Sequence, residues 1–139
     1  AMMKILQQKQ LIEPLLRYLY EDRPFFGICV ALQALFESSE EAPDEPGLGF
    51  LQGRVKRFDT RLAIPHIGWN GIKARQASHI FNDFSGMEKL YFVHSYHVEA
   101  DNCADILTTT DYGYEFVSAV RKGNIIATQF HPEKSGKAG

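Results

Sequence analysis

A single cysteine stands where an apolar run gives way to a helical pattern, in the stretch FFGICVALQ, residues 25–33. Its surroundings, G-x-C-x-A, are close to G-x-S-x-G, the nucleophile elbow in which a tight strand-to-helix turn lifts a nucleophile off the sheet. We expect the helix N-terminus beneath the sulfur of Cys29 to favour the thiolate, which is the nucleophilic form. On cysteine statistics alone, the alternative is a small buried structural residue.

A candidate base lies near the other end of the chain, in the stretch ATQFHPEKSG, residues 127–136. His131 ends an apolar strand pattern, and Glu133 follows two residues later. Pro132 disfavours helix at His131, and residues i and i+2 of an extended segment project to the same side. We therefore expect the Glu133 carboxylate to orient the imidazole and leave its second nitrogen for a thiol, as in a catalytic triad. The alternative is a surface turn with an incidental histidine and glutamate.

Helical and strand patterns alternate around these residues. Apolar residues at helical spacing predict helices over residues 1–8, 11–19 and 30–37, and a short buried strand at 25–29 precedes the last of them. The acidic stretch SSEEAPDEPGLG is predicted to be a loop because of its prolines and glycines. Further strands are predicted within residues 50–58, 63–72, 89–100 and 105–130. Helix, strand and helix in this order predict an α/β layer fold with a parallel sheet.

The composition fits one globular domain and excludes several classes of protein. The chain has 139 residues, of which 45% are hydrophobic, and a formal net charge of −2, which leaves no basic footprint for nucleic acid. No apolar run approaches the length of a membrane span, and no signal peptide is recognised. Two cysteines without a C-x-x-C pair fit a reducing cytoplasm. His94 and His97 are three apart in a predicted strand, hence on opposite faces, so we expect no shared metal.

The elbow cysteine and the strand-ending His-x-Glu far downstream together resemble the class I glutamine amidotransferase domain. Three further stretches, PHIGWN (65–70), YFVHSYHV (91–98) and ATQFHPEKSGKAG (127–139), are similar to one branch of that class, the glutaminase subunits or fused domains of imidazole glycerol phosphate synthases. With GICVALQALFE (27–37), the resemblance covers almost the whole chain. It implies a three-layer α/β fold with a central, mostly parallel sheet.

The resemblance also implies a reaction. Cys29 would attack the side-chain amide of glutamine, His131 would take the thiol proton and hand it to the departing ammonia, and Glu133 would orient His131. Water would then release glutamate from the thioester. The resemblance implies no cofactor and no metal.

Further residues match positions that bind the substrate in that family. Gln33, one helical turn after the cysteine, matches a glutamine-binding residue; its alternative is an ordinary exposed helix residue. The backbone N–H of Val30 matches an oxyanion-hole donor. Ser95 and Tyr96 match a segment that lines the glutamine pocket.

A protein partner is implied as well. The ammonia would pass to a (β/α)8-barrel cyclase, either a separate subunit or a fused domain, which closes the imidazole ring in histidine biosynthesis. Pro65, Trp69, Asn70 and Lys134 match positions that face this cyclase. Trp69 could instead be a core aromatic, but its glycine and asparagine neighbours favour a rim, where tryptophan often anchors an interface.

Two departures from the family pattern bear on activity. Ala31 stands where the family usually has glycine, and the extra methyl group is expected to strain the elbow or loosen the helix packing. The family domain opens with a strand, a helix and a glycine-rich oxyanion loop before the segment that Ala1 resembles, so residues 1–139 are interpreted as a partial domain, incomplete at the N-terminus. Two other functions stay open: an amidotransferase for another acceptor pathway, and a catalytically impaired fragment that acts only as an interaction domain.

Overall fold

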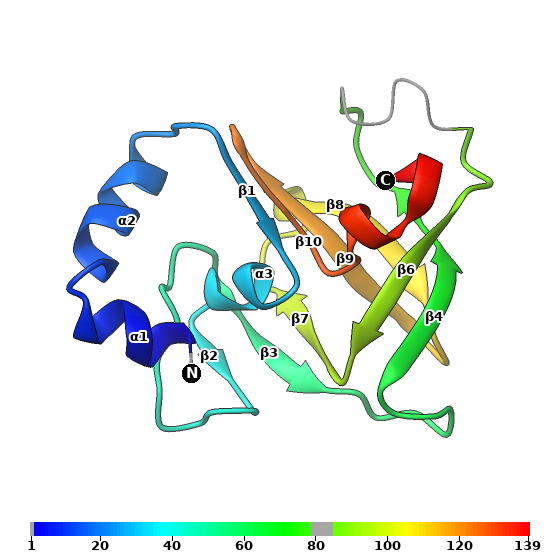
Figure 1. Cartoon of the computed structure of the whole chain (residues 1–139), viewed down its shortest axis with the longest axis horizontal. Helices are drawn as coiled ribbons and strands as arrows, with labels where there is room; N and C mark the ends of the chain where they lie inside the picture. The colour runs from blue at the N-terminus through cyan, green and yellow to red at the C-terminus, as the bar shows by residue number, and fades with distance from the viewer. Residues whose placement is uncertain (1, 79–84) are drawn as a thin grey trace.

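The computed structural model describes residues 2–78 and 85–139, and Figure 1 shows their arrangement. The helices are α1 (Met2–Gln8), α2 (Ile12–Tyr20) and α3 (Val30–Ala34), with short 3-10 turns η2 (Cys103–Asp105), η3 (Pro132–Lys134) and η4 (Gly136–Ala138). The strands are β1 (Phe25–Ile28), β2 (Ser38–Ser39), β3 (Gly53–Arg57), β4 (His66–Gly71), β5 (Lys73–Ala74), β6 (Lys89–His94), β7 (Tyr96–Ala100), β8 (Ile106–Asp111), β9 (Glu115–Lys122) and β10 (Ile125–Thr128). No helix in these two ranges is long and apolar enough to cross a membrane.

The main sheet is mixed, which confirms the α/β class but corrects the expectation of a mostly parallel sheet. Its strand order is β1-β10-β9-β7-β3-β2, with β8 paired to both β9 and β5. Among the described pairings, β1/β10 and β2/β3 are parallel and the others are antiparallel. The reason lies in the connections: β8, β9 and β10 follow one another through tight turns, which can join only antiparallel neighbours.

The segment predicted as one strand over residues 89–100 is divided at Ser95 between two sheets. Strand β6 pairs with β4 in a separate two-stranded sheet, whereas β7 belongs to the main sheet. Because the strand is interrupted, the alternation rule does not carry across Ser95. The rings of His94 and His97 both pack on the Phe58 ring, at centroid distances of 5.0 and 4.8 Å, so the prediction of opposite faces is wrong.

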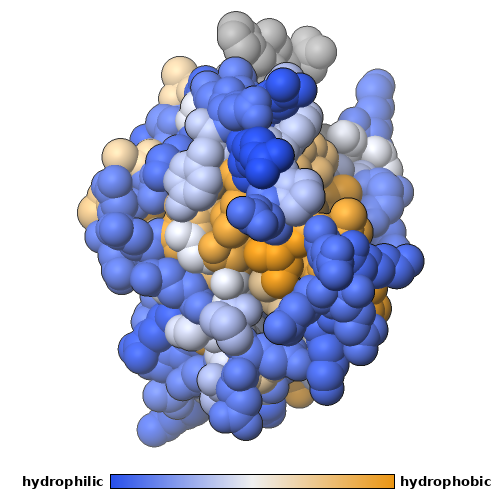
Figure 2. Space-filling view, turned by 90° about the vertical axis from the view of Figure 1, so that its left-hand side faces the viewer, coloured by the Kyte–Doolittle hydropathy of each residue, from blue (hydrophilic) through white to orange (hydrophobic). Residues whose placement is uncertain are grey.

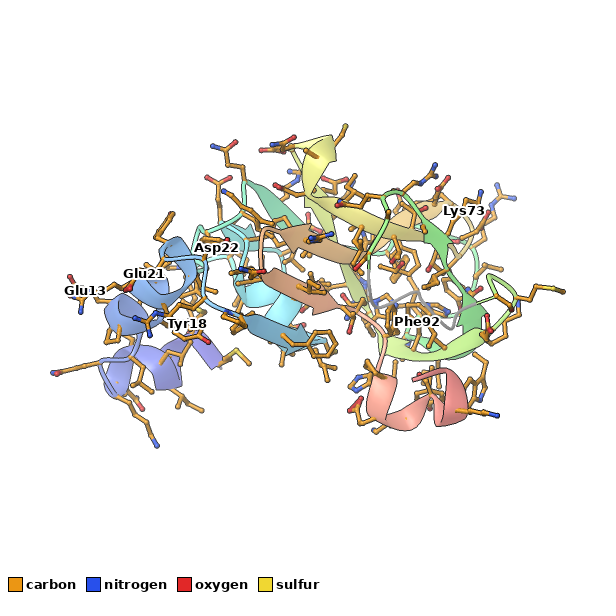
Figure 3. All side chains as sticks on the ribbon, turned by 90° about the horizontal axis from the view of Figure 1, so that it is seen from above. Glu13, Tyr18, Glu21, Asp22, Lys73 and Phe92 are labelled. Atoms are coloured by element: carbon orange, nitrogen blue, oxygen red, sulfur yellow. The ribbon has the colours of Figure 1, made fainter. Side chains whose placement is uncertain are left out.

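Two apolar clusters hold these layers together. Leu19 of α2 and Leu32 of α3 belong to the cluster that packs the helices on the main sheet. Phe92 of β6, Phe116 of β9 and Phe130 belong to the cluster beneath the two-stranded sheet. Figure 3 shows this separation, with the α2 side chains at one end of the molecule and Phe92 towards the other.

The three α-helices gather on the β1 side of the molecule (Figure 1), where β1 is the edge strand of the main sheet. Phe26 of β1 is 53% exposed. Figure 2, which views this side, shows an apolar patch framed by hydrophilic surface. Helix α3 ends at Ala34, three residues earlier than predicted, and the chain then enters β2 at Ser38.

Candidate active site

The backbone at Cys29 has the geometry of an elbow. Strand β1 ends at Ile28 and α3 begins at Val30, so Cys29 alone makes the turn. Its φ of 56° and ψ of −104° lie in a region that residues with a Cβ atom rarely adopt. The Cys29 N–H donates to the carbonyl of Thr128 at 2.7 Å, which ties the turn to β10. A strained turn held on both sides is what a fixed nucleophile requires.

The helix approaches the strand closely at this turn because Gly27 has no side chain. A Cβ atom placed on Gly27 would lie 3.0 Å from the Cβ of Ala31 and 3.0 Å from a ring carbon of Phe25. The methyl group of Ala31 thus occupies the space above Gly27. The elbow accommodates Ala31 through this pairing of a glycine with an alanine.

His131 and Glu133 make the hydrogen bond that their spacing predicts. The Nδ1 atom of His131 lies 3.1 Å from Oε2 of Glu133. His131 is extended and Glu133 lies in the single turn η3 that starts at Pro132. The hydrogen bond with His131 lowers the pKa of the exposed Glu133 carboxyl, which keeps this carboxylate charged at neutral pH.

The sheet brings the cysteine and the histidine to the same edge. Strands β1 and β10 are parallel neighbours, with Ile28 opposite Thr128, so the residues that follow them share the carboxyl edge of the sheet. Burial raises the pKa of the Cys29 thiol most, and the charge of Glu133 adds to this rise, which places the carboxylate within electrostatic range of the sulfur. Among the described contacts of the sulfur, however, the hydrogen-bond donor from a side chain is Gln129 and not His131.

Gln129 is a residue that the sequence interpretation missed. Its side chain is 0% exposed, and its Nε2 atom donates to Sγ of Cys29 at 3.4 Å. Its Oε1 atom accepts from Nε2 of Gln33 at 3.2 Å. A glutamine at the end of an otherwise apolar strand was the available signal, because a buried amide must find partners.

Burial is the largest influence on the thiol, and it raises the pKa of Cys29. The Val30 backbone N–H and the Gln129 amide lower this pKa, whereas the charges of Glu133 and Glu41 raise it further. The Val30 N–H at the helix N-terminus therefore does favour the thiolate, as expected, but the net effect of the surroundings is to raise the pKa. Helix α3 has only five residues, and burial outweighs its N-terminal N–H groups.

Gln33 faces into the protein and is not an ordinary exposed helix residue. Its Nε2 atom donates to the Tyr96 carbonyl at 3.3 Å as well as to Gln129. The Ser95 carbonyl accepts from the Phe58 N–H at 3.1 Å, which fixes the segment between β6 and β7. The two predicted pocket segments, around Gln33 and around Tyr96, are thus in direct contact.

A cavity of about 90 Å³ lies beside the elbow. Val30 and Gln33 of α3 line it together with Met3 of α1 and the loop residues Ser39 and Glu41. Ser95 and Tyr96 do not line it. The cavity therefore brings together two of the four residues predicted to bind substrate.

The residues predicted to face a partner lie on or next to the two-stranded sheet. Pro65, Trp69 and Lys134 are exposed, with 56% of Trp69 accessible, while Asn70 is partly buried. The Trp69 ring meets the Tyr91 ring edge-on at 5.7 Å. The exposure of Trp69 excludes the interpretation as a core aromatic and favours a place at the rim of an interface.

Known proteins are similar to this chain in sequence and in fold. The chain matches the family described as glutamine amidotransferase class-I over residues 7–139. It is 50% identical over 116 residues to the imidazole glycerol phosphate synthase subunit HisH 1 of Methanococcus maripaludis, which covers 84% of this chain and 57% of that protein. It is 46% identical over 141 residues to the chloroplastic imidazole glycerol phosphate synthase hisHF of Arabidopsis thaliana, which covers 99% of this chain and 24% of that protein.

A crystal structure of a glutamine amidotransferase superposes on 98% of this chain and 67% of its own, with a TM-score of 0.71 and 18% identity, and so shares the fold. The chain spans 57% and 24% of the length of the two curated relatives. Because the family match runs from residue 7 to residue 139, this chain belongs to the class I glutamine amidotransferases.

Proposed function

We propose that this chain carries the glutaminase chemistry of an imidazole glycerol phosphate synthase. In the first step the sulfur of Cys29 adds to the side-chain amide carbon of glutamine, and the thiol proton passes to His131. The C–N bond then breaks, and ammonia leaves with the proton that His131 returns. In the second step His131 takes a proton from water, the hydroxide attacks the thioester, and glutamate leaves as the thiol re-forms.

The observation that carries this proposal is the meeting of two strand ends. A cysteine at an elbow with φ of 56° follows β1, and a histidine bonded to a carboxylate at 3.1 Å follows the parallel neighbour β10. A nucleophile, a base and an orienting group at one sheet edge are the parts of a triad. The Val30 N–H, which is close enough to the sulfur to lower its pKa, supplies one oxyanion donor.

The partner of this site is a (β/α)8-barrel cyclase that receives the ammonia in histidine biosynthesis. The two relatives support this partner, because one is named as a subunit of an imidazole glycerol phosphate synthase and the other as such a synthase. Pro65, Trp69, Asn70 and Lys134 form the proposed contact with it. Both cysteines are free, which agrees with a cytoplasmic location.

A second candidate is an interaction domain that does not turn over glutamine. It is favoured by one observation, the raised pKa of a thiol whose side-chain partner is Gln129. An amidotransferase for another acceptor pathway is the third candidate, and it differs in the enzyme that receives the ammonia.

The test is glutamate release from glutamine by the purified chain, measured with and without a cyclase and its ligand. We expect the unaltered chain to release glutamate and Cys29→Ala to lose this activity. Cys103→Ala should keep it, since Cys103 is exposed and distant from the elbow in sequence. Labelling with a glutamine-like diazoketone, mapped by mass spectrometry, should mark Cys29. A chain that binds the cyclase but neither releases glutamate nor becomes labelled at Cys29 would favour the interaction domain.

A further inference from the structure

We propose that a relay of hydrogen bonds runs from Asn70 of β4 through the buried imidazoles of His66 and His94 to the carbonyl of Tyr96, where it meets the amides that hold Cys29. In this relay, His66 and His94 are positioning residues for the nucleophile. The inference rests on the proposed function, because that function makes Cys29 the reacting group. It adds two residues to which the sequence motifs assign no role.

The first half of the relay joins Asn70 to the Tyr96 carbonyl. The Nδ2 atom of Asn70 donates to the Asp111 carbonyl at 2.9 Å and lies 3.4 Å from Nε2 of His66. The Nδ1 atom of His66 lies 3.0 Å from Nε2 of His94. The Nδ1 atom of His94 lies 2.8 Å from the Tyr96 carbonyl oxygen.

The second half joins the Tyr96 carbonyl to the sulfur. The Nε2 atom of Gln33 donates to this same carbonyl at 3.3 Å and to Oε1 of Gln129 at 3.2 Å. The Nε2 atom of Gln129 then donates to Sγ of Cys29 at 3.4 Å. Five side chains and one backbone carbonyl thus connect β4 to the sulfur of Cys29.

Two backbone carbonyls fix the direction of the first half, because a carbonyl can only accept. The Tyr96 carbonyl requires the proton on Nδ1 of His94, so in a neutral ring Nε2 of His94 is a bare acceptor. His66 must then donate from Nδ1, which leaves its own Nε2 as an acceptor for the Asn70 amide. The Asp111 carbonyl independently fixes the orientation of the Asn70 amide, because it needs the NH2 group, and not the oxygen, of Asn70 to face it. Every donor in this half therefore has an acceptor.

Both imidazoles are in surroundings that keep them neutral. His66 and His94 are 3% and 6% exposed. Burial lowers the pKa of His66 to about 4 and that of His94 to about 3. The His66 ring stacks on Tyr112 at a centroid distance of 3.9 Å and on Phe92 at 4.9 Å, so it cannot turn freely. The relay is thus held by packing as well as by hydrogen bonds.

The position of the relay gives it a consequence for a partner. Asn70 follows the exposed Trp69 directly, on the rim proposed to face the cyclase. A partner that draws the Asn70 amide away would leave Nε2 of His66 without a donor in a buried place, which costs free energy. An exchange of tautomers does not lower that cost, because it would leave an N–H on Nε2 of His66 without an acceptor and set a bare Nδ1 of His94 against the Tyr96 carbonyl. A partner that leaves the Asn70 amide in place therefore keeps the relay intact.

The first test reads the tautomers directly. We expect 15N NMR of histidine-labelled protein at pH 7 to show the proton on Nδ1 in both His66 and His94. In His66→Phe, which removes the donor to His94, the proton of His94 should stay on Nδ1, because the Tyr96 carbonyl still requires it, and the Nε2 resonance should move towards that of an acceptor nitrogen without a donor. A proton on Nε2 of either ring in the unaltered protein would overturn the relay.

The second test measures the rate at which iodoacetamide alkylates Cys29 at pH 7, with the alkylation rate of Cys103 as the internal reference. His94→Phe should slow the alkylation of Cys29 about three- to tenfold, the range expected for one lost neutral hydrogen bond, because the Gln129 donor becomes less well held. His94→Asn, whose Nδ2 replaces the Nδ1 donor, should recover most of the rate.

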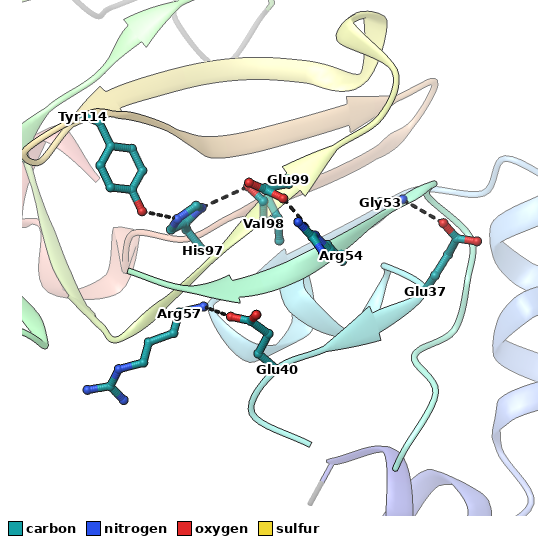
Figure 4. A network of polar contacts seen from close by, with 9 residues as sticks. All are labelled: Glu37, Glu40, Gly53, Arg54, Arg57, His97, Val98, Glu99 and Tyr114. Atoms are coloured by element: carbon teal, nitrogen blue, oxygen red, sulfur yellow. Dashed lines mark hydrogen bonds and ion pairs between the residues drawn. The ribbon is translucent and has the colours of Figure 1, made fainter. Parts of the chain in front are cut away.

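The matched control is His97→Asn. His97 is equally buried and packs on the same Phe58 ring, but its Nε2 atom bonds to the Tyr114 hydroxyl, away from the relay (Figure 4). If His97→Asn slowed the alkylation of Cys29 as much as His94→Phe does, the cause would be a general loosening of the packing around Phe58, and the proposal would be overturned. Neither test needs glutamine turnover, so a chain without glutaminase activity that still shows the relay would refute only the proposed function.

Discussion

The backbone N–H of His131 donates to the carbonyl of Tyr91 at 2.9 Å, and this bond joins the carboxyl end of β10 to the middle of β6. Ser135 reinforces the junction: its hydroxyl accepts from the Tyr91 N–H at 3.0 Å and donates to the His131 carbonyl at 2.6 Å. The ring of Tyr91 also supports Trp69. The candidate base is therefore fixed by the same sheet that carries the candidate partner surface.

Ser135→Ala should lower kcat for glutamine hydrolysis and destabilise the fold. Ser135 is 2% exposed, and its removal breaks two hydrogen bonds that hold His131, for a loss of about 1–3 kcal/mol in the free energy of unfolding. Urea unfolding and steady-state kinetics measure the two effects. Ser85→Ala is the control, since Ser85 is exposed and does not line the cavity beside the elbow. A Ser135→Ala enzyme with unchanged kcat would show that His131 needs no such clamp.

His131→Ala should reduce thioester formation by about 10²–10⁴-fold, the range for loss of a positioned proton acceptor. Glu133→Gln should cost less, because the glutamine keeps an oxygen that can accept from Nδ1 of His131 and only the charge is lost. Single-turnover kinetics with glutamine compare the two variants. If Glu133→Gln were the more damaged enzyme, the assigned roles of base and orienting group would be wrong.

Trp69→Ala should weaken cyclase binding by about 2 kcal/mol or more while leaving the isolated chain almost as stable, because an exposed aromatic anchor contributes mainly to an interface. Ile67→Ala is the matched control, since Ile67 is 58% exposed two residues earlier on β4. Titration calorimetry gives the affinity and urea unfolding gives the stability. A large loss of stability without a change in affinity would contradict the rim interpretation.

Much of the local structure could be predicted from the sequence, whereas the contacts between segments could not. The alternation of residues 105–130 gave three strands, and the G-x-C-x-A spacing placed Cys29 at a strand-to-helix turn, because both signals are local. The division at Ser95 depends on which sheet each half joins, and no residue spacing records that choice. Gln129 and the His66–His94 pair were missed for the same reason: their partners are distant in sequence.

The elbow offers a prediction about Gly27 and Ala31. Gly27→Ala should cost about 1–3 kcal/mol of unfolding free energy, because the new methyl group would lie 3.0 Å from the Cβ of Ala31. Ala31→Gly alone should cost at most about 1 kcal/mol through helix propensity. The double variant should lose less unfolding free energy than the sum of the two single losses, because replacing Ala31 removes its clash with the new methyl group. Gly71→Ala is the control, since a methyl group there meets only the end of Lys89 at 3.6 Å. Strict additivity in urea unfolding would show that the two residues do not press on each other.

The buried histidines predict a stability that falls in mild acid. Burial lowers the folded-state pKa of His66 to about 4 and of His94 to about 3, against an ordinary value of 6.5. The neighbouring charges of His66, His97 and His131 lower the pKa of His94 further, and its bond to the Tyr96 carbonyl raises it.

Between about pH 4 and 6.5 the unfolded chain binds protons at these two rings and the folded chain does not, so the free energy of unfolding falls as the pH falls through this window. Urea midpoints measured from pH 8 to pH 4 should therefore decline, and His94→Asn should flatten the decline because it removes one of the three histidines, with His66 and His97, whose pKa burial lowers. The carboxyl groups titrate alike in both proteins, so the difference between the two curves isolates His94. Parallel curves would mean that His94 is protonated equally in both states, and the neutral, directional relay would fail with it.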